Sequence, residues 1–482
     1  MIRRATHIIF WILLSINLLM AQSNHTCTGI PVRMEDYQKE SEKALRNLEN
    51  KGYPFATTTL QCADVHQDMS TVMLIDTNQF ITFDSIVLKG DVKLSKGFLY
   101  PYLGLRRGTA YNESLMQQVN RKLTELSCAT VIRDAEVSFV EDKAYLYVYL
   151  DSKRVNQFDG YIGIIPTNEI TGKMAVNGEL TLALQNVFKQ GESIGLHWYS
   201  SEHSSQHLNL SVKFPYLFKT RFGIRGDFLL DKQDTSFLTL NYHIGLPYSF
   251  VNNSYIEPYF DYSSSIVLDS NLRGNMRDTI CRDYQKSLYG LKVHYRKLDY
   301  LYNPRKGIDL QGDISVGRRK FTDVNKLENS NSESPEATYR VYASAQGYIP
   351  IGQHLVITPK VQFGTPVSGT VYYNELRKIG GIGGIRGFNP NDIAASTFLL
   401  YSAELRYLFG KKSYANLFFD GGTYEQNMPD YYRKDSPFGF GAGIHLAVKS
   451  GIFYLEYALG RQLGNPIQLK TGKIHFGVQV EF

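Results

Sequence analysis

Apolar and polar residues alternate along most of the chain, from about residue 155 to the C-terminus. In the last run, Ile474, Phe476 and Val478 alternate with polar residues, and this period of two predicts β-strands with differently solvated faces. The number of long strands is even, as it is in bacterial outer-membrane barrels. This number favours a transmembrane β-barrel over a soluble sandwich. Sixteen strands are predicted, at residues 155–165, 173–185, 191–201, 205–214, 220–230, 235–245, 254–264, 286–296, 307–316, 337–349, 354–364, 398–409, 413–423, 437–448, 451–460 and 472–482.

The chain before residue 155 has a mixed pattern of helical and strand-like segments. Residues 22–79 predict a helix over 34–48, followed by strands at 55–60 and 72–76. Residues 80–153 predict a β-α-α-β-β unit with Asn112 as a helix N-cap. Its elements are a strand at 81–90, helices at 96–105 and 112–126, and strands at 131–140 and 145–151. Two α+β segments are therefore expected before the barrel.

The first 21 residues have the pattern of a secretory signal peptide. Arg3 and Arg4 precede an apolar run from Ile8 to Met20, and Ala21 follows. After this run, no apolar stretch approaches the ~18 residues that a spanning helix needs. Any residence in a membrane must therefore come from the strands.

The composition is consistent with an exported barrel. The net charge is only +6 with mixed signs, so we expect no nucleic-acid partner. Aromatic residues make up 13% of the chain and include 34 Tyr, which suits the aromatic girdles of a barrel. For the four cysteines, one disulfide between Cys27 and Cys62 is expected, with Cys128 and Cys281 free or buried. Their spacing suggests no metal site.

A glycine-rich stretch lies in the predicted loop 365–397. Residues Ile379 to Phe388 contain five glycines, which allow close backbone approach, and one arginine, Arg386. Parity within the two following strands places Glu404 on the polar face of the first. It also places Phe418 and Asp420 opposite the apolar face of the second. If the loop folds into the barrel lumen, Arg386 should meet Asp420 and Glu404 there.

These residues carry a resemblance to a known family. Ile385, Arg386, Gly387 and Phe388, followed by Phe418-x-Asp420-x-Gly422, resemble the paired motifs of the BamA/TamA/two-partner-secretion superfamily of POTRA-containing outer-membrane barrel proteins. In that family the first motif caps a lumen-inserted loop, and its arginine meets the aspartate of the second motif. The resemblance implies a partial POTRA-like segment at 22–79, a POTRA domain at 80–153 and a sixteen-stranded barrel at 154–482. It also implies a location in the bacterial outer membrane, with the POTRA part in the periplasm.

The function that the resemblance implies is assembly, insertion or translocation of polypeptides, without cofactor or metal. The expected partners are the outer-membrane lipid bilayer, unfolded or β-strand polypeptide clients, and periplasmic or outer-membrane accessory proteins. The first and last strands would meet at a lateral seam, for which the sequence offers Gly160, Gly163, Gly477 and Phe482. Two alternatives stay open: a two-partner-type secretion transporter that passes a polypeptide through the pore, and an inactive scaffold or pore.

One catalytic pattern is discounted. Gly191 to Gly195 matches the spacing of a nucleophile elbow around Ser193. That motif requires a strand, a turn and a helix, whereas Ser193 opens an alternating run with no helix after it. The protein is therefore expected not to be an enzyme.

Overall fold

A computed structural model of the protein divides into two compact units, residues 1–152 and 153–482. Each unit is described by itself. The predicted signal peptide, Cys27 and Phe482 lie outside the described residues. The described residues are 28–33, 35–65, 68–153, 155–168, 173–200, 205–234, 236–250, 254–269, 281–301, 303–322, 334–367, 370–389, 392–410, 412–448 and 451–479.

The first unit begins with a three-stranded antiparallel sheet and one helix. Its elements are β1 (Thr28–Pro31), α2 (Tyr37–Glu49), β2 (Thr57–Val65) and β3 (Asp68–Asp76), with strand order β1-β3-β2. The Tyr37 hydroxyl donates to the Thr58 carbonyl at 3.2 Å, which holds the helix on the sheet. The helix and two strands match the sequence-based expectation. Strand β1 was not expected, because four residues are too few to show a period.

The rest of the first unit has the predicted β-α-α-β-β order. Its elements are β4 (Thr82–Lys89), α3 (Lys96–Leu103), α4 (Glu113–Thr124), β5 (Ala129–Val140) and β6 (Lys143–Ser152). The Asn112 side chain caps α4 by accepting a hydrogen bond from the Leu115 amide at 2.9 Å, as predicted. The strand order β4-β6-β5 leaves β4 and β5 at the sheet edges. No helix in the described ranges is long and apolar enough to cross a membrane.

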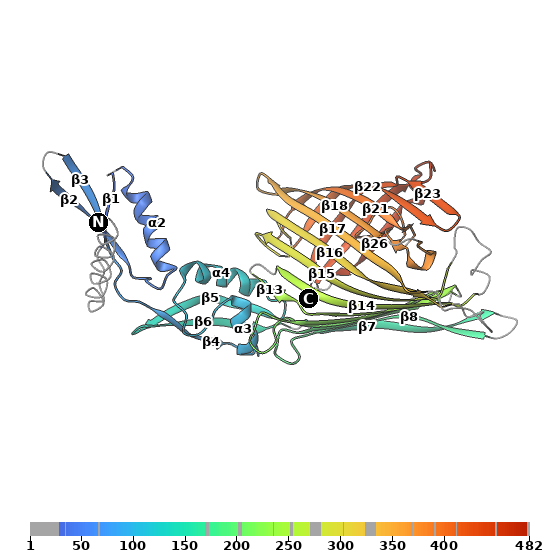
Figure 1. Cartoon of the computed structure of the whole chain (residues 1–482), viewed down its shortest axis with the longest axis horizontal. Helices are drawn as coiled ribbons and strands as arrows, with labels where there is room; N and C mark the ends of the chain where they lie inside the picture. Colours follow the sequence, from blue (N-terminus) through green and yellow to red (C-terminus); the bar gives the residue numbers. More distant parts are fainter. Residues whose placement is uncertain are drawn as a thin grey trace, which may run out of the picture. The chain divides into compact units, whose positions relative to one another are not determined.

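The second unit is one large antiparallel sheet whose strand order is that of a closed barrel (Figure 1). Its first strands are β7 (Gln157–Asn168), β8 (Lys173–Gln185), β9 (Ser193–Ser200), β10 (Gln206–Phe214), β11 (Ile224–Gln233), β12 (Phe237–Gly245), β13 (Tyr248–Ser249), β14 (Tyr255–Val267) and β15 (Tyr284–Leu298). The others are β16 (Gly307–Phe321), β17 (Glu336–Ile351), β18 (Leu355–Val367), β21 (Thr397–Leu408), β22 (Tyr414–Met428), β23 (Tyr431–Asp435), β24 (Phe438–Val448), β25 (Gly451–Arg461) and β26 (Lys473–Gln479).

Two of these segments continue a neighbouring strand across a proline. Strands β12 and β13 both pair with β14, and Pro247 separates them. Strands β23 and β24 both pair with β22, on either side of Pro437. Proline has no amide hydrogen to donate to the ladder, so it interrupts each strand. Counted in this way, the described residues of the barrel sheet form sixteen antiparallel strands, which confirms the predicted fold class.

The strand order returns from β26 to β7. Each other pair of neighbouring strands has a defined register among the described residues, as in β15 and β16 from Leu298↔Gly307 to Tyr284↔Phe321. Between the described residues of β26 and β7 no register is defined. Strand β7 continues past its predicted end to Asn168, with an irregular register between Pro166 and Asn168.

The two faces of the sheet differ as the alternation predicts. In β21 the side chains of Leu399 and Tyr401 are 44% and 50% exposed, whereas Leu400 and Glu404 are 4% and 8% exposed. The apolar residues of the outer face suit lipid, because hydrocarbon cannot satisfy polar groups. The inner face is less polar than expected here, since Phe398 and Leu400 are covered by the loop described next.

Candidate functional site: the anchored loop of the lumen

Between β18 and β21 the described residues, 370–389 and 392–396, fold against the inner face of the barrel. Its described part contains a single 3₁₀ turn, η4 (Tyr373–Glu375), and two short strands, β19 (Arg377–Lys378) and β20 (Ala394–Ala395). Strands β19 and β20 pair with each other, so the two limbs of the loop are joined at its base. The glycine-rich stretch lies beyond this pairing, at the end of the loop.

An apolar cluster holds the end of the loop against the wall. From the loop it contains Ile379, Ile385, Phe388, Ile393 and Ala395, and from the wall strands it contains Phe398, Leu400 and Tyr424. Ile385 is fully buried. Phe388 therefore packs on the inner wall, as expected from the sequence. The buried apolar area supplies a non-directional attraction that the ion pairs below make specific.

Arg386 binds Asp420 through three donors. Its Nε and Nη2 atoms lie 2.7 and 2.8 Å from the two carboxylate oxygens, and its own backbone amide donates at 3.1 Å. Ser402 donates a further hydrogen bond to the same carboxylate at 2.6 Å. Asp420 is 2% exposed and Arg386 is 8% exposed. This bidentate, charge-assisted geometry requires a planar guanidinium, so a lysine at this position would not reproduce it.

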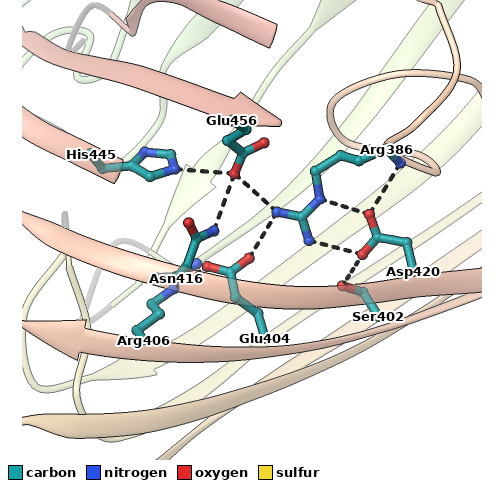
Figure 2. A network of polar contacts seen from close by, with 8 residues as sticks. All are labelled: Arg386, Ser402, Glu404, Arg406, Asn416, Asp420, His445 and Glu456. Atoms are coloured by element: carbon teal, nitrogen blue, oxygen red, sulfur yellow. Dashed lines mark hydrogen bonds and ion pairs between the residues drawn. The ribbon is translucent and has the colours of Figure 1, made fainter. Parts of the chain in front are cut away.

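Two further carboxylates and one aromatic ring complete the surroundings of Arg386 (Figure 2). Its Nη1 atom donates to Glu404 at 3.1 Å and to Glu456 at 3.0 Å. The guanidinium carbon lies 3.4 Å from the ring centroid of Phe418. The loop arginine thus contacts three strands, β21, β22 and β25. Parity predicted the contacts with Asp420 and Glu404, and the structure brings these residues together.

Glu456 was not predicted, although the same signal points to it. It lies on the polar face of β25, between the outward-facing Leu455 and Tyr457. Applying the parity argument to a third strand would therefore have placed it in the lumen. Its carboxylate also accepts a hydrogen bond from Asn416 at 3.2 Å, and His445 Nε2 lies 3.2 Å away. Figure 2 shows His445 and Asn416 directed at Glu456.

Glycines allow the backbone to approach the wall this closely. Gly387 has φ +98°, and a Cβ there would lie 2.7 Å from the Gly460 amide nitrogen. A Cβ on Gly439 would lie 1.9 Å from the Arg386 carbonyl oxygen. Gly422, the last residue of the second motif, is similarly close to the neighbouring strand, at 2.5 Å from the Leu399 carbonyl oxygen. The glycines of both motifs are therefore required by close contact, and Gly387 also by conformation.

The other limb of the loop has a second charged anchor, at Glu375. Its carboxylate accepts from Arg319 Nη1 at 2.7 Å and from Lys286 Nζ at 2.9 Å. The Arg319 side chain is fully buried and also binds Glu336 at 2.6 Å. Beside it, the Asn374 amide donates to Ser265 Oγ at 2.8 Å and to the Arg282 carbonyl at 2.9 Å. These contacts fix the turn η4 to β14, β15 and β16.

Sequence reasoning missed this anchor for a physical reason. The predicted strand 307–316 ends before Arg319, so no parity assigned Arg319 to the lumen. In the structure β16 continues to Phe321, paired with β15 over its whole length. A charged residue at the end of a strand resembles a loop residue until its partner strand is known.

The residues predicted for a lateral seam are only partly placed. Gly163 lies in β7 opposite Asn177, and Gly477 lies in β26 opposite Tyr454. Gly160 also lies in β7, where it faces Leu180 of β8. Phe482 lies outside the described residues. Strands β26 and β7 are neighbours in the strand order, and a seam at these glycines stays a prediction.

Two of the four cysteines are buried in the described core. Cys128 is buried in the first unit, and Cys281 is buried beside Phe237 and Val267 in the second. The expected Cys27–Cys62 disulfide involves a residue outside the described ranges, so it stays a prediction.

Comparisons with known proteins give one family match and several similar folds. Residues 186–482 match the Omp85 superfamily domain. CdiB from Acinetobacter baumannii aligns with a TM-score of 0.56 at 15% identity, over 92% of this chain and 81% of that one. CdiB from Escherichia coli aligns with a TM-score of 0.53 at 12% identity, over 92% and 84%. BamA from Haemophilus ducreyi lacking POTRA domains 1–3 aligns with a TM-score of 0.49 at 17% identity, over 92% and 93%. No curated protein matches the sequence.

At these identities the two CdiB structures support the fold and nothing beyond it. The domain match shows the family, because it covers more than half of the chain and includes the lumen loop with both motifs. An outer-membrane location follows from it, as does a general role in inserting or secreting polypeptides. The chain therefore belongs to the Omp85 superfamily.

Proposed function

We propose that the protein inserts strand-forming polypeptides into the outer membrane through the seam between β7 and β26. The mechanism is physical and needs neither a catalytic residue nor a cofactor. A client strand would pair with an exposed strand edge at the seam, because unpaired backbone groups of an edge accept a new strand by β-augmentation. The membrane would then receive the client beside the barrel.

The observation that carries this proposal is the double anchoring of the lumen loop. Arg386 contacts three carboxylates on one side, and Glu375 contacts two buried or half-buried cations on the other. A polypeptide passing along the lumen would have to break both sets of ion pairs. Breaking a buried pair leaves an uncompensated charge and costs on the order of 3–5 kcal/mol. The route beside the loop, at the seam, avoids that cost and is therefore favoured.

The first unit supports the same function as a receiving module. Its residues 80–152 form a sheet in which β4 and β5 are edges, and a client strand could pair with either. We propose that this α+β module is a POTRA domain, that residues 22–79 act as a partial POTRA-like segment, and that both lie in the periplasm. Accessory proteins would bind the same edges by the same chemistry.

A seam-locking experiment tests the proposal. A panel of cysteine pairs is introduced, one residue within 161–165 of β7 and one within 473–477 of β26, and disulfides are formed in the folded protein. Insertion is followed as the rate at which a small eight-stranded barrel protein folds into phospholipid vesicles containing the protein. We expect locked pairs to abolish the acceleration and reduction to restore it.

A matched control locks two strands away from the seam. Leu182 and Leu196 lie directly opposite each other in β8 and β9, so L182C/L196C adds a disulfide without touching the seam. This control should retain full activity. Normal insertion with the seam locked would reject the proposal.

The alternative is a two-partner-type secretion transporter. The 640 Å³ cavity within the lumen supports this alternative, because a polypeptide in transit needs open space there. In that case release of the loop anchors should raise transport, whereas a locked seam should have no effect. An inactive scaffold would respond to neither change. Photocrosslinking from β7 and β26 in cells, with identification of the captured polypeptides, separates these outcomes.

A further inference from the structure

We infer that the lumen cavity beside the loop is a binding site for a small multivalent anion that carries carboxylate or phosphate groups. The cavity has a volume of about 640 Å³. Cavities of roughly 300–1,000 Å³ are typical of small-molecule sites. This inference does not depend on whether the barrel inserts or secretes polypeptides.

The charges that line the cavity are unevenly matched. Every lining carboxylate has a basic partner within ion-pair distance. Asp227 binds Arg225 at 2.6 Å, and Asp261 binds Arg340 at 2.6 Å. Asp313 lies 4.0 Å from Arg340, Asp231 lies 3.8 Å from His207, and Glu375 binds Lys286 and Arg319. Each acidic side chain of the wall thus has at least one basic neighbour, with Arg340 shared by Asp261 and Asp313.

Two lining cations lack such a partner. Among the residues that the structure describes, neither Arg377 nor Lys378 has a carboxylate within ion-pair distance, whereas Lys292 lies directly opposite Glu257 and Asp313 on the neighbouring strands. The lumen does not lack carboxylates in general, because Arg386 contacts three of them in the same barrel. Arg377 is exposed and Lys378 is half-buried, so both can bind an anion in the cavity without first breaking an internal ion pair.

Arg377 is held in a geometry suited to an anion. Its guanidinium carbon lies 4.5 Å from the ring centroid of Tyr342 and 5.5 Å from that of Phe398. A guanidinium stacked on aromatic rings keeps the N–H donors at its edge, where they can bind a carboxylate or phosphate bidentately. Lys378 is positioned in a similar way, with Nζ 4.2 Å from the ring centroid of Tyr373 and 3.2 Å from its hydroxyl.

The backbone that carries these two cations is fixed before any ligand binds. Arg377 and Lys378 form β19, which pairs with Ala395 and Ala394 of β20. Two residues before Arg377, Glu375 is the buried anchor to Arg319 and Lys286. Fixing the donors in advance reduces the entropy lost on binding, which is a property of built sites. Lys292 reaches the same cavity from β15 in the wall.

Binding of inorganic tripolyphosphate to the full-length protein in phospholipid nanodiscs tests the inference. Isothermal titration at low salt should show saturable binding with about one site per chain. Arg377→Gln and Lys292→Gln should each weaken binding roughly tenfold or more, since each removes a charge-assisted contact. Citrate and a short oligoglutamate peptide, titrated in parallel, distinguish a small phosphate, a small carboxylate and an acidic polypeptide as the source of the anion.

A control on the opposite face of the same strand makes the test specific. Lys297 belongs to β15, as Lys292 does, but points outward and is exposed. Lys297→Gln should bind tripolyphosphate as the unaltered protein does, and all variants should keep the electrophoretic shift of a folded barrel. Absence of saturable binding, or equal binding by Arg377→Gln, Lys292→Gln and Lys297→Gln, would overturn the inference.

Discussion

The two anchors of the lumen loop solve one physical problem with opposite charges. At one limb a loop cation, Arg386, enters a group of wall carboxylates, Glu404, Asp420 and Glu456. At the other limb a loop anion, Glu375, enters a pair of wall cations, Arg319 and Lys286. A long loop loses much conformational entropy when it becomes ordered, and ion pairs at both limbs offset that loss.

The anchors differ in how completely they are satisfied. Arg386 uses all its side-chain donor nitrogens, and a ring covers its face. Arg319 keeps a buried Nε without a hydrogen-bond partner, and its second carboxylate partner, Glu336, has a side chain that is 49% exposed. We therefore expect the Arg386 anchor to be the stronger and less easily exchanged of the two. The Glu375 anchor is the more suitable one to open reversibly.

The largest effect is expected for Arg386→Ala. This change leaves three buried carboxylates with fewer partners, at a cost on the order of 3–5 kcal/mol before lumen water reduces it. The loop end at 379–388 should become accessible to protease and should exchange amide hydrogens faster, and insertion of the client barrel should fall. The heat-modifiable band of the folded barrel should persist, because the strand ladder does not depend on Arg386.

Arg386→Lys is the matched control for that prediction. It keeps the charge but loses the bidentate geometry, so its effect should lie between those of the alanine variant and the unaltered protein. An unchanged loop in Arg386→Ala would contradict the anchoring role.

A smaller effect is expected for Glu375→Gln. The charge is removed, but Arg319 retains Glu336, and the hydrogen bonds of Asn374 to Ser265 and Arg282 remain. Hydrogen exchange should rise at 372–378 and stay unchanged at 385–388. Loosening of both regions together would show that the loop moves as one body rather than as two anchored limbs.

Glu456→Gln should have a weaker effect still. Glutamine keeps an oxygen that can accept from Asn416 and Arg386, and the bidentate contact of Arg386 with Asp420 is untouched. We expect a loss of about 1 kcal/mol, in the range of a single hydrogen bond. The urea midpoint of loop release, measured by protease accessibility, checks this value against Asp420→Asn, which should be far more damaging.

The smallest expected quantity is the coupling between the two anchors. In the double variant Arg386→Ala/Glu375→Gln, the two free-energy changes should add within about 0.5 kcal/mol, as for sites without shared partners. The same protease assay on the four proteins of the cycle gives the coupling energy. A value well above this limit would mean that one anchor stabilises the other through the loop.

Local alternation of apolar and polar residues determined most of the fold. Parity within a strand is set by the geometry of the chain itself, so it placed the sixteen strands and assigned Glu404 and Asp420 to the lumen. The glycines around Arg386 likewise indicated close contact, which Gly387 shows through its positive φ and its approach to Gly460. These signals are local, so they do not depend on the positions of distant residues.

Only the tertiary structure decided which distant side chains meet across the lumen. The contacts of Glu375 with Arg319, the third carboxylate at Glu456, and the cavity around Arg377 join strands far apart in the sequence. Their distances depend on the stagger and tilt of all strands around the barrel, which no single run of residues encodes. The sequence by itself therefore determined the strands, their faces and the Arg386 motif. The arrangement of the strands around the loop decided which distant side chains come into contact.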